Sequence, residues 1–327
     1  MKFLKALPAL LVLALSVNNA HAIFNDSVDR QPSKPAASWL NDLVATGIAD
    51  FTDYQIGDEW GKKPTTRETL KGHSGAFIRT SLATARYGGG TAFYLGKFNG
   101  HHMMATNHHV MPDARICDSR FAIFPLLGLK FHCEKFYGDW TNIDLALFSI
   151  TVGQPEDEEK LAQIAGNFAW HKTLYPGEEL ITAGYGVFRN SQRNLVVNED
   201  GDCKVFSDKG DYRFITDPDK INPADYQAWS FSTGCDVSHG DSGSSMVDRV
   251  TGEVVGIIWT TATQKPERIR SSSYLLEVLS KQNEDVWQWL SYGVPAPKIF
   301  DFLKEKLQSG AFKDPDTALT IETVLRN

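Results

Sequence analysis

From Gly75 onward the chain is built of short β-rich runs separated by glycines and polar residues, and this pattern constrains the fold most. The runs lie at residues 76–80, 90–96, 121–124, 145–150, 180–184, 195–197, 203–206, 227–232 and 254–260. Many short strands at such spacing, with few long helical periods between them, indicate an all-β barrel or sandwich. Two helix-prone pieces, at 155–165 and 274–290, interrupt the pattern.

A glycine-rich turn at residues 240–244 reads Gly-Asp-Ser-Gly-Ser and places Ser242 between two glycines. A nucleophilic hydroxyl must project from a tight turn whose backbone approaches the substrate closely, which glycine permits. The N–H groups of Gly240 and Ser242 are candidates for binding the oxyanion that develops in acyl transfer. An ordinary serine–glycine turn is the alternative, but at average residue usage this pentapeptide arises by chance less than about once per thousand such chains.

A nucleophilic serine needs a base and an orienting acid. Residues 104–110 follow the 90–96 run after a turn at Asn99-Gly100 and contain the adjacent pair His108 and His109. Asp144 leads a hydrophobic run at 145–150, where apolar neighbours shield a carboxylate that holds an imidazole in one tautomer. Taken alone, Asp144 is equally well explained as a surface aspartate that begins a strand.

Together, Thr-Asn-His-His-Val at 106–110, Asp-Leu-Ala-Leu at 144–147 and Gly-Asp-Ser-Gly-Ser at 240–244 resemble the chymotrypsin-like (trypsin fold) serine peptidases, especially the exported bacterial type. The resemblance covers roughly residues 75–305. It implies a double β-barrel with a final strand at 291–295 and a C-terminal helix at 299–307. On the same alignment, residues 262–290 are an insertion between the last two strands.

The resemblance also implies the catalytic roles. His109, directly before Val110, takes the catalytic position, and His108 takes the variable one. Peptide bonds would then be cleaved by the Ser-His-Asp mechanism, with Ser242 as nucleophile, His109 as general base and Asp144 as its orienting acid. No metal or other cofactor is needed. A zinc site among His101, His102, His108 and His109 is disfavoured, because adjacent side chains on an extended chain face opposite sides and no thiolate lies nearby.

Substrate specificity is less constrained. Asp236 precedes Ser242 by six residues, where trypsin-like members place the aspartate that binds Lys or Arg in the S1 pocket, and Trp259 and Thr261 lie on the strand that resembles the wall of that cleft. A structural role for Asp236 remains equally open, since Thr260 and Thr261 replace the glycines that keep the trypsin cleft open.

The first 22 residues have a basic start, a short apolar core and an Ala-x-Ala ending, which predict a secretory signal peptide. Its removal leaves 305 residues that begin at Ile23, and the formal charge moves from −7 to −9 because two lysines leave. An acidic chain without a basic run argues against nucleic acid or an anionic membrane as partner. We therefore expect a periplasmic or secreted protein with peptide or protein substrates, whose oligomeric state stays open.

Four cysteines in an exported chain predict two disulfides, for which three connectivities exist. We favour Cys117–Cys133 and Cys203–Cys235, because each pair is close in sequence and flanks strand-like segments.

Residues 23–70 differ from the rest and are predicted to be an extension or a propeptide, with one amphipathic helix near residues 38–48, ahead of a peptidase domain at 71–327. In trypsins the aspartate before the nucleophile, here Asp241, pairs with an N-terminus freed by cleavage. No Ile-Val-Gly-Gly sequence exists here, a cut after Lys71 would free an unsuitable glycine, and His239 is the candidate partner for Asp241 instead.

The functional alternative is a non-catalytic trypsin-fold protein that binds partners through the same cleft. Such proteins usually lose one member of the triad, whereas all three candidates are present here. The sequence therefore favours an enzyme.

Overall fold

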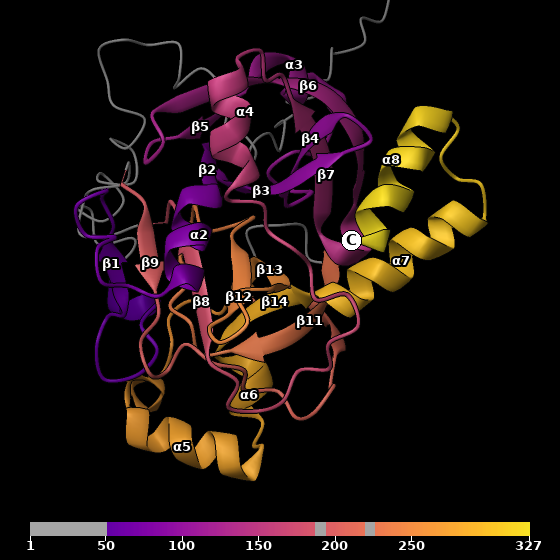
Figure 1. The fold of residues 1–327 in the computed structure, drawn as a ribbon. Coiled ribbons are helices and arrows are strands. Elements are labelled where there is room, and N and C mark those ends of the chain that lie inside the picture. Colours follow the sequence, from indigo (N-terminus) through magenta and orange to yellow (C-terminus); the bar gives the residue numbers. More distant parts are fainter. Residues whose placement is uncertain (1–50, 187–193, 220–225) are drawn as a thin grey trace, which may run out of the picture.

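The computed structural model describes residues 51–186, 194–219 and 226–327 (Figure 1). The predicted signal peptide and the predicted helix near residues 38–48 lie outside these ranges. No helix within them is long and apolar enough to cross a membrane.

Six antiparallel strands form a closed barrel in the order β2-β3-β4-β7-β6-β5 (Figure 1, upper part). Their bounds are Thr84–Tyr87 for β2, Gly90–Phe98 for β3, His101–Thr106 for β4, Phe121–Phe124 for β5, Leu129–Trp140 for β6 and Leu145–Ile150 for β7. The turn between β3 and β4 is at Asn99 and Gly100, as predicted, and both residues have positive φ.

Eight strands form the second sheet, in the order β1-β9-β8-β12-β13-β14-β11-β10. The bounds are Lys62–Pro64 for β1, Leu180–Gly184 for β8, Val196–Asn198 for β9, Arg213–Thr216 for β10, Gln227–Thr233 for β11, Ser245–Asp248 for β12, Val254–Thr261 for β13 and Ser291–Pro295 for β14. β1 pairs antiparallel with β9 through Lys62 and Asn198, so part of the predicted N-terminal extension is a strand of this sheet.

The chymotrypsin-like, all-β fold is confirmed, with helices at its periphery. They are η3 Phe51–Asp53, α2 Gly75–Ala83, α3 Ala114–Ser119, η4 Thr141–Ile143, α4 Pro155–Ala162, η5 Glu267–Arg270, α5 Ser272–Lys281, α6 Asp285–Gln288, α7 Ala296–Gln308 and α8 Pro315–Arg326. The insertion between β13 and β14 contains η5, α5 and α6, and the expected C-terminal helix is α7. Figure 1 shows α7 and α8 side by side along the barrel.

Two strand predictions were wrong. Residues 76–80 lie in helix α2, whose N-cap Ser74 accepts a hydrogen bond from Phe77 N at 3.1 Å. The buried residues of this helix follow a helical spacing, and a five-residue β-rich run does not distinguish that spacing from a strand. Residues 203–206 make only isolated bridges, to Glu179 and Thr233, and form no strand of either sheet.

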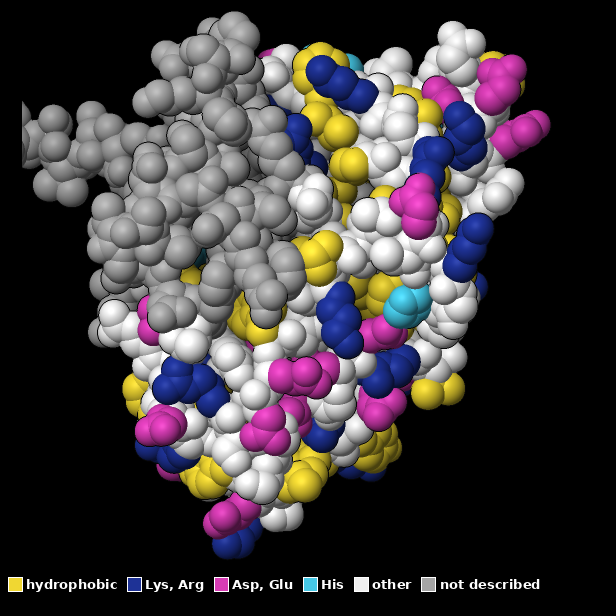
Figure 2. All heavy atoms as spheres, turned by 90° about the vertical axis from the view of Figure 1, so that its left-hand side faces the viewer, with side chains coloured by type: hydrophobic (Ala, Val, Ile, Leu, Met, Phe, Trp, Pro, Cys, Tyr) yellow, Lys and Arg dark blue, Asp and Glu magenta, His cyan; other side chains and the backbone are white. Residues whose placement is uncertain are grey.

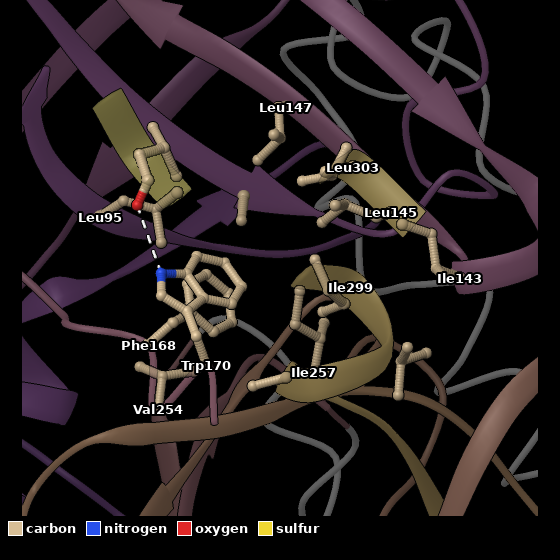
Figure 3. Close-up of a cluster of buried hydrophobic side chains, with 14 of the residues drawn as sticks. Leu95, Ile143, Leu145, Leu147, Phe168, Trp170, Val254, Ile257, Ile299 and Leu303 are labelled. Atoms are coloured by element: carbon tan, nitrogen blue, oxygen red, sulfur yellow. Dashed lines mark hydrogen bonds between the residues drawn. The ribbon is translucent and has the colours of Figure 1, made fainter. Parts of the chain in front are cut away.

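The largest hydrophobic core joins the barrel, the second sheet and helix α7 (Figure 3). In it Leu145 and Leu147 of β7 lie close to Ile299 and Leu303 of α7. Fully burying one such side chain stabilises the fold by about 1.5–3 kcal/mol. Ile143 belongs to the same cluster and precedes Asp144, so packing of the core holds the start of β7 in place.

Candidate active site

The predicted base lies in a turn directly after β4. The side-chain amide of Asn107, itself fully buried, donates to the backbone oxygen of Asp144 at 2.8 Å. The backbone nitrogen of Met111 donates to Asn107 O at 3.1 Å and closes the turn. This turn brings the segment that carries His109 against the residue predicted to be its acid.

Asp144 follows the short helix η4 and has a left-handed backbone with φ 34°. Its carboxylate is fully buried and accepts a hydrogen bond from His109 Nδ1 at 2.8 Å on Oδ2 and one from the His109 backbone nitrogen at 3.1 Å on Oδ1. A carboxylate accepts only, so Nδ1 carries the proton and Nε2 is the nitrogen that can accept one. The side chain of His109 is 19% exposed.

The electrostatics of His109 come from opposed effects. Burial lowers the pKa of its imidazole, but the charge of Asp144, the hydrogen bond to it, and the more distant Asp217 and Asp219 raise it, and the net pKa lies above the ordinary value. An imidazole that acts as a base must be neutral, so His109 could act as a base only at pH values near or above this raised pKa.

The adjacent histidines have different partners. His108 Nδ1 is hydrogen-bonded to Asp139 on β6, whereas His109 is bonded to Asp144. Residues 107–110 form a turn rather than an extended segment, so the two rings do not simply face opposite sides.

The loop that carries Ser242 lies between β11 and β12. Gly240 and Gly243 have φ values of +95° and +85°, which side-chain-bearing residues rarely adopt. A Cβ on Gly243 would lie 2.1 Å from Thr91 O and 2.4 Å from Thr106 Oγ1, at the ends of the strands that lead to the histidine turn. Thr91 N also donates to Ser242 O at 2.9 Å. The loop therefore packs directly on the barrel, with Ser242 half-buried.

Two backbone donors of this loop have no acceptor among the residues that the structure describes. Within the described ranges no hydrogen bond is donated by the N–H of Gly240 or of Ser242, the predicted oxyanion donors. The peptide between Asp241 and Ser242 has a defined orientation, because Asp241 O accepts from Ser244 N at 2.9 Å. In a trans peptide the N–H points opposite to the C=O, so the Ser242 N–H points away from Ser244.

Tyr226 belongs to this site and was missed from the sequence. Its hydroxyl donates to Asp144 Oδ1 at 2.5 Å, and its ring lies 6.5 Å from that of His109, edge to face. Burial, followed by the charge of Asp144, raises the pKa of Tyr226 above its ordinary value, so the hydroxyl stays a donor. Nothing in the sequence marks this tyrosine, which is separated from Asp144 by 82 positions.

Tyr226→Phe removes only this donor. We expect kcat to fall about tenfold, as for loss of one hydrogen bond to a charged group, with KM little changed. The less solvated Asp144 carboxylate then favours the imidazolium more strongly, so the pKa of His109 rises and the acidic limb of the pH–rate profile moves to higher pH. Profiles of kcat/KM for both proteins measure this, and superimposable profiles with equal kcat would contradict it.

The three residues predicted to line an S1 pocket are all buried. The carboxylate of Asp236 accepts from Ile56 N at 2.8 Å and from Gly61 N at 2.6 Å, and burial raises its pKa to about 8. Trp259 Nε1 donates to Ser230 Oγ at 2.9 Å within the core.

Thr261 contacts a buried lysine that no sequence pattern indicates. Its hydroxyl accepts from the buried amine of Lys265 at 2.9 Å. Burial lowers the pKa of Lys265 to about 7, against the opposing charge of Asp236.

Both favoured disulfides, Cys117–Cys133 and Cys203–Cys235, are present in the structure. The first ties helix α3 to β6, and the second joins the turn at 203 to the loop that leads to Ser242. His239, considered as a partner for Asp241, instead lies 3.6 Å from Asp219, measured from Nε2 to Oδ2.

The family model of the trypsin-like peptidase domain matches residues 90–257. A search of curated proteins found no match. Among solved structures, the chain is similar to Rv3671c from M. tuberculosis H37Rv in its inactive form, with 15% identity, coverage of 79% of this chain and 98% of that one, and a TM-score of 0.47. It is also similar to the HtrA-type protease AlgW with tripeptide, with 15% identity, coverage of 72% and 63%, and a TM-score of 0.45.

Proposed function

Since this chain belongs to the trypsin-like peptidase domain family, we propose that it is an exported serine endopeptidase that works through Ser242, His109 and Asp144. The observation that carries the proposal is the hydrogen bond of 2.8 Å between His109 Nδ1 and the buried Asp144. This bond leaves Nε2 as the nitrogen of His109 that can accept a proton. His109 follows β4, a barrel strand on which the Ser242 loop packs.

The proposed reaction begins when His109 removes the proton of Ser242 as the hydroxyl attacks a peptide carbonyl. Asp144 stabilises the imidazolium that forms, and the N–H groups of Gly240 and Ser242 bind the oxyanion. His109 then protonates the leaving amine, and water hydrolyses the acyl-enzyme by the reverse proton path. General acid–base catalysis typically contributes about 10²–10⁴-fold, and one oxyanion donor about 10²–10³-fold.

A preference for Lys or Arg at P1 has little support from Asp236. Its two oxygens hold the backbone of Ile56 and Gly61, its side chain is fully buried, and burial raises its pKa to about 8. The hydroxyl of Thr261 already accepts a hydrogen bond from the buried amine of Lys265. We therefore propose no P1 preference for this enzyme.

Export is proposed from the predicted signal peptide together with the two disulfides, since disulfides persist in oxidising compartments. On the face shown in Figure 2, the described basic and acidic side chains are mixed with one another. Such mixing does not favour a polyanionic partner.

The test is reaction of the purified mature protein with a fluorophosphonate, followed by mass spectrometry of the labelled peptide and by cleavage of a mixed peptide library. We expect one label, on Ser242, and cleavage that prior labelling abolishes. A non-catalytic binding protein of the same fold would give neither label nor cleavage. A label on another residue would contradict the assignment of the nucleophile.

A further inference from the structure

A buried ion pair lies directly beside the proposed nucleophile. Lys62 Nζ is paired with Asp241 Oδ2, and the two side chains are only 2% and 3% exposed. Lys62 belongs to β1, whereas Asp241 immediately precedes Ser242, 179 positions later. The ammonium also donates to Ser238 Oγ at 3.0 Å.

Asp241 is the centre of the hydrogen bonds that shape the loop. Its carboxylate accepts from Gly186 N at 3.0 Å and from Ser238 N at 2.9 Å, in addition to Lys62. Its backbone nitrogen donates to Ser238 O at 3.0 Å, and its carbonyl accepts from Ser244 N at 2.9 Å. The hydrogen bonds of Asp241 therefore fix both the direction of its side chain and the orientation of the peptide that carries the Ser242 N–H.

The segment that supplies Lys62 is itself held in the second sheet. Lys62 and Pro64 pair with Asn198 and Val196 of β9, and Figure 1 shows β1 and β9 side by side. Just before this strand, the backbones of Ile56 and Gly61 donate to Asp236, in the same loop region that leads to Ser242. Residues 56–64 thus contact both buried aspartates, Asp236 and Asp241, of the segment that carries Ser242.

We propose that Lys62 is a positioning residue that holds the Ser242 loop and its oxyanion donors in the active arrangement, and that the active enzyme retains residues 56–64. A buried carboxylate that loses its counter-charge is strongly disfavoured and turns toward water. For Asp241 that movement would rotate the adjoining peptide and withdraw the Ser242 N–H from the oxyanion. With an internal lysine in this place, the pairing of Asp241 needs no new N-terminus.

The inference rests on the proposed function, and its test compares Lys62→Met with Lys62→Arg and with a control, Lys172→Met. Lys172 also pairs with an aspartate, Asp248, at the other end of β12 from the Ser242 loop. The measurements are kcat and KM on a cleaved peptide, the rate of fluorophosphonate labelling, and thermal unfolding.

We expect Lys62→Met to lower kcat and the labelling rate by about 10²-fold or more, the effect of losing an oxyanion donor, while KM changes much less. Lys62→Arg, which keeps the charge, should have a kcat at least tenfold higher than that of Lys62→Met. Lys172→Met should keep the wild-type kcat. A folded Lys62→Met protein with wild-type kcat overturns the inference, and so does an equal loss in the arginine variant.

A second measurement does not depend on the variants folding. The N-terminus of the fluorophosphonate-labelled wild-type protein is determined by mass spectrometry, and we expect it to lie before Ile56. A labelled species that begins after Pro64 overturns the inference while leaving the proposed function intact. Absence of any label on the wild-type protein contradicts the proposed function, and the inference with it.

Discussion

Ser242→Ala is expected to lower kcat for peptide hydrolysis by about 10⁶-fold, because removal of a catalytic serine costs about as much as removal of a whole triad. The nucleophile is lost, and the neighbouring loop retains the backbone contacts that position it, such as Thr91 N to Ser242 O. The measurement is turnover of a peptide from the library at saturating concentration, with thermal unfolding of the same preparation to show that the fold is unchanged.

Ser245→Ala is the matched control, since this serine lies three residues further on, in β12, and its backbone pairs with Ile257. It should retain the wild-type kcat. Wild-type turnover by the Ser242→Ala protein would mean that another residue is the nucleophile.

His109→Ala should cost a similar factor of about 10⁶ in kcat, because Ser242 then has no base and the leaving amine no acid. His108→Ala is the matched control, and it separates two adjacent side chains of the same chemistry. His108 is hydrogen-bonded to Asp139 rather than to Asp144. His108→Ala should therefore lower kcat by less than the roughly 100-fold expected for loss of a general base. Both variants are assayed on the same peptide across pH 5–9, a range that extends on both sides of the ordinary histidine pKa of about 6.5.

The wild-type protein should lose activity on the acidic side as His109 becomes protonated, with the midpoint above the ordinary histidine value because of Asp144. The His108→Ala protein should keep that midpoint. Equal losses in the two histidine variants would contradict the assignment of His109.

The motif residues could be predicted from sequence because their chemistry requires particular residue types next to one another. Ser242 between glycines, a histidine before Val110 and an aspartate before a hydrophobic strand are each local patterns. The structure places His109 and Asp144 in contact as those patterns imply. The two disulfides followed from the small number of pairings and the short separations of 16 and 32 residues.

The strands were predictable where β-rich runs are bounded by turn residues, as for β5, β7 and β8. Helix α2 was not predictable, because its short run of alanine, phenylalanine and isoleucine suits either a helix or a strand. Only the Ser74 cap and tertiary packing decide between the two. Propensity over five residues is too small a free energy to outweigh tertiary packing.

The sequence by itself determined the fold class, the family resemblance and the identity of the candidate nucleophile, base and acid, since these depend on local pattern and residue chemistry. Only the tertiary structure decided that Tyr226 bonds Asp144, that Asp236 holds the backbone at Ile56 and Gly61, and that Lys62 pairs with Asp241. These partners are 82 to 180 positions apart, and no local pattern records them. They arise because burial of a charge or a hydroxyl requires a partner, and the folded chain supplies whichever polar group its packing brings near.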